Sequence, residues 1–252
     1  MASDDVGGRR SFCWPDGRRA ALSVTFDDAR PSQLERGLPI LDAHGARATF
    51  YVSLEPMAGR LEEWRSVAAA GHEIGNHSLR HPCSGNFSFA RENPLEGYTL
   101  ERVEREMLNA NDAIEKMLGV RPQSFAYPCG QTFVGRGRKQ KSYVPVVARH
   151  FVVGRRAFDE VHNHPLYCDL ACATGMDSDM ADRGALMAMV EAAAADGGWL
   201  ILFGHDVGDG GRQVTLAGAL DELCGYARDP ASGLWMDTVA AVGAYVRDAR
   251  RR

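Results

Sequence analysis

The chain of 252 residues lacks several features that would place it in a broad class at once. No run approaches the roughly 18 consecutive apolar residues that a membrane-spanning helix needs, so no membrane partner is expected. The first ten residues contain two aspartates and no apolar stretch, unlike a secretory leader. The protein as written is therefore expected in the cytoplasm, or outside the cell if this sequence lacks its leader.

Excess positive charge and closely paired cysteines are also lacking. The formal net charge is −4, which gives no indication of a nucleic-acid partner. The six cysteines include no C-x-x-C pair, so their spacing predicts neither a zinc finger nor a disulfide framework. Cys168 and Cys172 lie four residues apart and are interpreted as buried thiols. Nothing in the sequence specifies an oligomeric state.

The chain does contain short apolar runs that alternate with segments of helical periodicity. Strands are predicted at residues 21–26, 48–52, 72–76, 124–127, 151–153, 169–174 and 199–203. Helices are predicted at residues 32–44, 61–70, 99–118, 181–195, 215–228 and 238–250. This alternation predicts an α/β fold with a parallel sheet. About seven such units indicate a single domain over residues 1–252 that forms an incomplete (β/α) barrel. An open doubly wound sheet is the alternative.

Polar clusters follow four of the predicted strands. They begin at Asp27, Asn76, Tyr127 and His205. In a parallel barrel the carboxyl ends of all strands open onto one face, and active sites lie on that face. The coincidence of four clusters therefore predicts a site at this end of the barrel.

The spacing of His77 and His81 is typical of two ligands to one metal ion. A separation of four residues on a helical turn would bring both imidazoles to one side. Asp27 or Asp28 would add a carboxylate, although one of them could instead cap the following helix. Three ligands leave positions open for water and substrate, as a catalytic site requires. His205 is a candidate third nitrogen ligand or a general acid.

These motifs resemble the polysaccharide deacetylase family of carbohydrate esterases. The matching residues are Thr25-Phe26-Asp27-Asp28, His77-Ser78-x-x-His81-Pro82, a turn at Pro128, and His205 after an apolar strand. The resemblance covers about residues 20–245 and implies a distorted, incomplete (β/α) barrel. It also implies that Asp27 is the catalytic base and His205 the acid. Asp28, His77 and His81 would bind one divalent ion, with zinc expected.

The third family motif departs from the pattern at two positions. The family usually has an arginine there that braces the base, and this chain has Ala126. The family often has a tyrosine beside the proline, and this chain has Cys129. The resemblance still implies a turn through Tyr127 and Pro128 in which the Cys129 amide helps to hold the oxyanion.

Other positions are candidates for the remaining family roles. Arg80, inside the second motif, could replace the missing arginine. Asp177 and Asp179 are candidates for the aspartate that orients the catalytic histidine.

The resemblance implies that the chain removes N- or O-linked acetyl groups from a polysaccharide or oligosaccharide. A first alternative is an intracellular amidase on a small cyclic amide, which fits the missing arginine and the absent leader. A second is a non-catalytic carbohydrate-binding relative. The ligand set of two histidines and a carboxylate also fits an iron oxygenase, but the usual all-β scaffold of those enzymes does not fit these helices.

Overall fold

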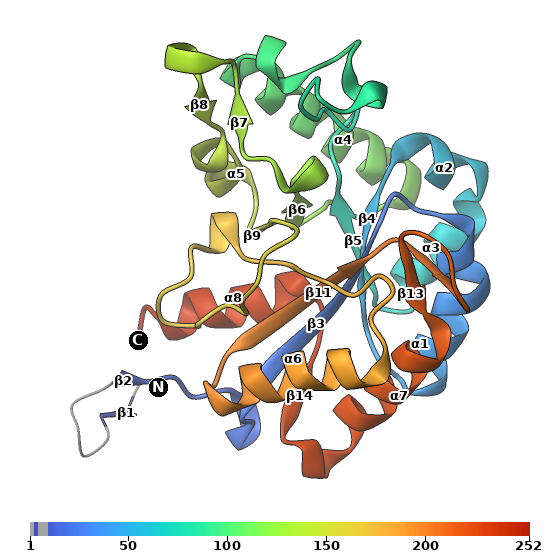
Figure 1. Cartoon of the computed structure of the whole chain (residues 1–252), viewed down its shortest axis with the longest axis vertical. Coiled ribbons are helices and arrows are strands. Elements are labelled where there is room, and N and C mark those ends of the chain that lie inside the picture. Colours follow the sequence, from blue (N-terminus) through green and yellow to red (C-terminus); the bar gives the residue numbers. More distant parts are fainter. Residues whose placement is uncertain (1–2, 5–9) are drawn as a thin grey trace.

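A curled parallel sheet forms the centre of the protein in the computed structural model, which describes residues 3–4 and 10–252 (Figure 1). Its strands are β3 (Ala20–Asp27), β4 (Thr49–Val52), β5 (Glu73–Asn76), β6 (Ser124–Ala126), β9 (Val153–Arg155), β10 (Met176–Asp177), β11 (Trp199–Gly204) and β14 (Leu234–Met236). Seven of them follow the order β10-β11-β3-β4-β5-β6-β9, and β14 pairs with the first residues of β3. A parallel bridge from Arg155 to Ala173 extends the curl toward β10.

Helices surround the outside of this sheet (Figure 1). They are α1 (Leu38–Ala43), α2 (Leu54–Gly59), α3 (Leu61–Ala69), α4 (Leu100–Leu118), α5 (Val144–His150), α6 (Arg183–Ala195), α7 (Ala217–Arg228) and α8 (Val239–Ala249). A π-helical turn, η2 (Gln33–Gly37), leads into α1. The longest helix, α4, begins where the Thr99 side chain accepts a hydrogen bond from Arg102 N and ends at Gly119, whose φ is 73°.

Shorter elements lie in the connections. The 3-10 turns are η1 (Pro15–Gly17), η3 (Ser88–Ala90), η4 (Leu95–Gly97), η5 (Pro128–Gly130), η6 (Gly137–Lys139), η7 (Leu170–Cys172) and η8 (Pro230–Ser232). The short strands are β1 (Ser3–Asp4), β2 (Arg10–Ser11), β7 (Phe133–Val134), β8 (Lys141–Ser142), β12 (Asp206–Gly208) and β13 (Val214–Leu216). No helix within the described ranges is long and apolar enough to cross a bilayer. The expectation about a leader falls mostly on residues outside those ranges.

The sheet confirms the expected incomplete barrel and excludes the open doubly wound alternative. The predicted position of the sixth strand, residues 169–174, was wrong. Residues 170–172 form the turn η7, which the Asp169 side chain caps, and the strand begins at Met176. Strand β14 was not predicted, since three residues between two helices carry too little periodicity. Cys168 and Cys172 are partly exposed rather than buried.

Alternation along β3 explains how the site is built. All eight residues of the strand are buried. Leu22, Val24 and Phe26 join the main apolar core, which also contains side chains of α6 and α7. Successive side chains of a strand point to opposite faces, so the residues between them, ending at Asp27, face the inside of the barrel. The strand therefore delivers a carboxylate to the interior at its carboxyl end.

Candidate active site

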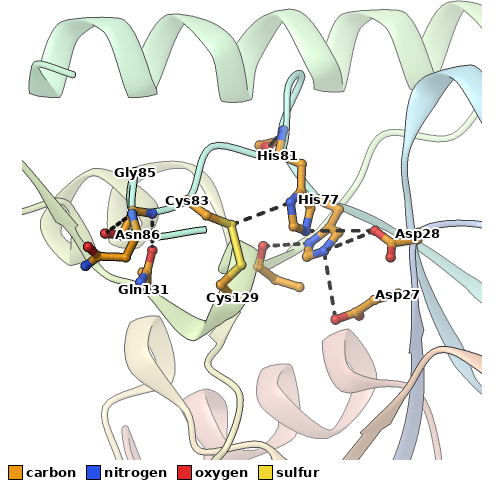
Figure 2. Close-up of a disulfide and its surroundings, with 12 residues drawn as sticks. Asp27, Asp28, His77, His81, Cys83, Gly85, Asn86, Cys129 and Gln131 are labelled. Atoms are coloured by element: carbon orange, nitrogen blue, oxygen red, sulfur yellow. Dashed lines mark hydrogen bonds and ion pairs between the residues drawn. A yellow bond between two sulfur atoms is a disulfide. The ribbon is translucent and has the colours of Figure 1, made fainter. Parts of the chain in front are cut away.

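The carboxyl ends of β3 and β5 bring two acidic and two imidazole side chains together (Figure 2). The Nε2 atoms of His77 and His81 lie 3.8 and 3.9 Å from Asp28 Oδ1. One ligand atom from each of these three residues lies within 4.8 Å of the others, a spacing at which they could hold one metal ion. The second carboxylate, on Asp27, has Oδ2 3.9 Å from His77 Nε2.

The backbone that presents these ligands is irregular. Asp28, Ser78 and His81 have φ values of 76°, 67° and 48°, in the left-handed region. Asn76 Oδ1 accepts a hydrogen bond from Ser78 N at 2.6 Å, and Ser78 Oγ accepts one from His81 N at 2.9 Å. Short polar side chains thus stabilise the turns. The expected helical turn between the two histidines was therefore wrong, although both imidazoles do approach Asp28.

The protonation of the imidazoles suits metal binding. His77 Nδ1 lies 3.0 Å from the Ala126 carbonyl oxygen, so it donates its proton there and leaves Nε2 facing Asp28. Burial and the neighbouring His77 lower the pKa of His81 to about 4, so its ring is neutral at pH 7. Burial would raise the pKa of Asp28, but His77, His81 and Arg30 outweigh burial and lower it. The set offers two imidazole nitrogens and one carboxylate.

Arg30 is a further contact of this set that the sequence analysis missed. Its Nη2 donates to Asp28 Oδ2 at 3.2 Å, and its Nη1 donates to Asp206 Oδ2 at 2.8 Å. Ser53 Oγ donates to Asp28 Oδ1 at 3.4 Å. Arg30 therefore holds one oxygen of Asp28 so that the other faces the imidazoles. Its position two residues after Asp28 was the feature of the sequence that could have indicated this contact.

Arg155 supplies the guanidinium that the third motif lacks. Arg155 Nη2 donates to Asp27 Oδ1, and both side chains are almost fully buried. The guanidinium lies over the ring of Tyr51, 4.9 Å from its centroid, and 5.2 Å from that of Phe203. Burial would raise the pKa of Asp27, but the charges of Arg155 and His77 outweigh burial and lower it. The base candidate is therefore ionised and braced.

Arg155 contacts Asp27 from the strand next to the one that carries Ala126. Ala126 on β6 and Arg155 on β9 are direct partners in the sheet, so the arginine stands beside the position where the family usually has it. Arg80 is exposed, which contradicts its candidacy. The available signal was an arginine directly after an apolar run at residues 151–154.

His205 is oriented by Asp179 and not by Asp177. His205 Nδ1 lies 2.6 Å from Asp179 Oδ2, and His205 N donates to Asp179 Oδ1 at 3.1 Å. Asp177 Oδ1 instead accepts from Asp179 N at 2.9 Å. Burial lowers the pKa of His205, but the hydrogen bond to Asp179 and the charge of Asp27 outweigh burial and raise it. The use of Nδ1 by Asp179 leaves Nε2 for other partners.

Cys129 is joined to Cys83 in a disulfide, which corrects the expectation of no disulfide. The two residues are 46 positions apart in sequence, and their Cα atoms are 6.2 Å apart. The bond connects the loop after His81 to the turn η5, where Cys129 follows Tyr127 and Pro128 and has a φ of 53°. Neither cysteine belongs to a C-x-x-C pair, so spacing alone gave no signal for the disulfide.

Comparisons with known proteins identify the family of the chain. A model of the polysaccharide deacetylase family matches residues 15–141, half of the chain. A chitooligosaccharide deacetylase of Bradyrhizobium sp. (strain ANU 289) is 34% identical over 107 residues, 42% of this chain and 43% of that protein. A peptidoglycan-N-acetylglucosamine deacetylase of Bacillus cereus is 25% identical over 143 residues, 52% of this chain and 47% of that protein. The chain thus spans less than half the length of these relatives.

The fold comparison covers more of the chain. A crystal structure from Mycobacterium smegmatis, assigned to the polysaccharide deacetylases, has a TM-score of 0.70 and 20% identity over 94% of this chain and 93% of that one. That likeness shows the fold, and the family match covers the segment that contains Asp27, Asp28, His77 and His81. The chain belongs to the polysaccharide deacetylase family.

Proposed function

We propose that this chain is a metal-dependent hydrolase that removes acetyl groups, N- or O-linked, from a polysaccharide or oligosaccharide. The observation that carries the proposal is that two neighbouring carboxylates have different contacts. Asp27 is buried against Arg155, whereas Asp28 faces two imidazoles. Environments that separate the tasks of two neighbouring carboxylates are typical of acid–base sites.

The donor set of Asp28, His77 and His81 fits a divalent ion, and zinc is the expected one. Two nitrogens and one oxygen leave coordination positions open, and the Ala126 carbonyl fixes the orientation of the His77 ring. When bound, such an ion would polarise an acetyl carbonyl and make a water molecule more acidic.

Asp27 is assigned the role of base. Arg155 occupies its Oδ1, which leaves Oδ2 on the side of His77 and the proposed ion. A carboxylate with a lowered pKa stays ionised over the working pH range and accepts a proton from the attacking water. Because Asp27 and Arg155 are packed inside the barrel, the acceptor oxygen keeps a fixed position.

His205 is assigned the role of acid, and Asp179 that of positioning residue. With Nδ1–H held by Asp179, the protonated ring presents its other proton at Nε2 to the leaving nitrogen or oxygen. The Cys129 amide, in the turn through Tyr127 and Pro128, is assigned to the developing oxyanion. The disulfide to Cys83 supports this role because it restrains the turn that carries the amide.

The proposal is tested by acetate release. We expect acetate from N-acetylated or O-acetylated oligosaccharides and no opening of a cyclic ureide. Chelation should abolish the release and added zinc should restore it. Ring opening without acetate release would favour the cyclic-amide alternative instead. The missing arginine was one of the two observations that favoured the cyclic-amide alternative. It no longer does so, because Arg155 contacts Asp27 in its place. A tightly held ion with no turnover on any substrate would favour the non-catalytic alternative.

Replacement of Asp179 should change the pH dependence of the reaction. Asp179→Asn removes the charge that raises the pKa of His205, so His205 loses its proton at lower pH. The basic limb of the rate profile should therefore move to lower pH, and kcat near pH 8 should fall by about tenfold or more. The measurement is kcat against pH. Asp177→Asn is the matched control, because it keeps an oxygen acceptor for Asp179 N. An unchanged pH profile in Asp179→Asn would show that Asp179 does not position His205 or raise its pKa.

A further inference from the structure

The His81 ring lies between two sets of metal-binding atoms. Its Nε2 lies 3.9 Å from Asp28 Oδ1, on the side of the proposed catalytic ion. Its Nδ1 lies 3.6 Å from Cys83 Sγ, on the side of the disulfide. Figure 2 shows the disulfide on the opposite side of the imidazoles from Asp28. The proposed reaction uses the first side of the ring only.

The second side has the composition of a zinc site once the disulfide is open. Two cysteine thiolates and one imidazole are preferred zinc ligands, and one atom each from His81, Cys83 and Cys129 lies within 4.8 Å of the others. A tetrahedral zinc with bonds of about 2.3 Å to sulfur and about 2.0 Å to nitrogen separates these two ligand atoms by about 3.5 Å. The distance from His81 Nδ1 to Cys83 Sγ, 3.6 Å, is already close to this value.

We propose that reduction of the Cys83–Cys129 disulfide creates a second zinc site, formed by both thiolates and His81 Nδ1, that competes with the first. A neutral imidazole has a lone pair on only one of its nitrogens. His81 can therefore bind an ion through Nε2 or through Nδ1, but not through both. The reduced protein would hold its ion at a position where Asp28, a ligand of the first site, does not bind it.

The redox step needs a dithiol reductant. Its thiolate attacks a sulfur of the disulfide, the S–S bond breaks, and two electrons from the dithiol produce two protein thiols while the reductant closes to its own disulfide. Cys129 is partly exposed and Cys83 is buried, so attack is expected at Cys129 Sγ. The thiols release their protons when zinc binds. Reoxidation reverses the exchange and returns His81 to Asp28 and His77.

The test uses cobalt in place of zinc in the metal-free full-length chain. The oxidised protein and a dithiol-reduced protein, freed of reductant under anaerobic conditions, are each titrated with Co²⁺ alone. We expect a sulfur-to-cobalt charge-transfer band in the reduced protein only, with a single ion bound per chain in both states. Acetate release by the zinc-loaded protein should fall by about tenfold or more on reduction and return on reoxidation. Absence of the band, or binding of two ions, would overturn the proposal.

Variants identify the ligands and separate this inference from the proposed function. The competition for His81 and the activity readout rest on that function, whereas the charge-transfer band does not. Cys83→Ser and Cys129→Ser should each lose the charge-transfer band. The double variant Cys168→Ser/Cys172→Ser is the matched control and should keep it, because these free cysteines lie outside the cluster. Asp28→Ala should keep the band in the reduced protein. In the oxidised protein this variant should lose the ion that binds to the first site. The wild-type pair of spectra decides the question even if a cysteine variant does not fold. A band that survives in both Cys83→Ser and Cys129→Ser would contradict the assignment.

Discussion

Replacement of Asp28 or His77 by alanine should remove both the bound ion and acetate release. Each side chain supplies one of three ligand atoms in a site with open positions, so the loss of one leaves two ligands. An ion that contributes several kcal/mol to transition-state stabilisation corresponds to a rate loss of about 10³-fold, at 1.36 kcal/mol per factor of ten. Metal content after dialysis and the initial rate of acetate release are the two measurements.

The chain offers a matched pair of control residues for this experiment. His44 and Asp221 are also a histidine and an aspartate in contact, with Nε2 and Oδ1 2.8 Å apart, but they lie between α1 and α7 on the outside of the barrel. His44→Ala and Asp221→Ala should keep metal content and rate near those of the wild type, since surface ion pairs contribute at most about 1 kcal/mol. Full activity in Asp28→Ala or His77→Ala would refute the proposed metal centre.

Much of this site could be predicted from sequence because parallel strands align their carboxyl ends. Asp27 and His205 each stand where an apolar run ends, and that position places them on one face whatever the details of the loops. The pairing of β6 with β9 could not be predicted in the same way. Which residue lies beside Ala126 depends on the register of two strands separated by a long connection, and that register places Arg155 against Asp27.

The loops limited prediction for a different reason. The His77–His81 segment uses left-handed residues supported by Asn76 and Ser78, so spacing alone wrongly indicated a helical turn. The disulfide joins two loops whose cysteines are 46 residues apart in sequence and that lie together only in the folded barrel. Side-chain caps and long-range contacts of this kind leave no periodic signal in the chain.

Arg155→Ala should reduce both stability and activity, because it leaves the buried Asp27 carboxylate without its cationic partner. Breaking a buried ion pair on one side costs about 3–5 kcal/mol of unfolding free energy. In the wild type the lowered pKa of Asp27 adds stability above its unfolded pKa, and that stability is lost as the pH falls through the folded value. In the variant, burial raises the pKa, so the ionised carboxylate destabilises the fold as the pH rises. Denaturant unfolding at pH 5 and pH 8 should show the larger deficit at pH 8.

The swap variant Arg155→Ala/Ala126→Arg tests whether the charge or the position matters. Ala126 is the direct sheet partner of Arg155, so an arginine there starts from the neighbouring strand and can reach the same carboxylate. We expect Arg155→Ala to lower kcat and to move the acidic limb of its pH profile upward, since Asp27 would be protonated at higher pH. The swap should reverse part of both changes. Arg80→Ala, at an exposed position, should alter neither. An Arg155→Ala enzyme with a wild-type acidic limb would show that Asp27 does not depend on this guanidinium, and its assignment as the base would lose its main structural support.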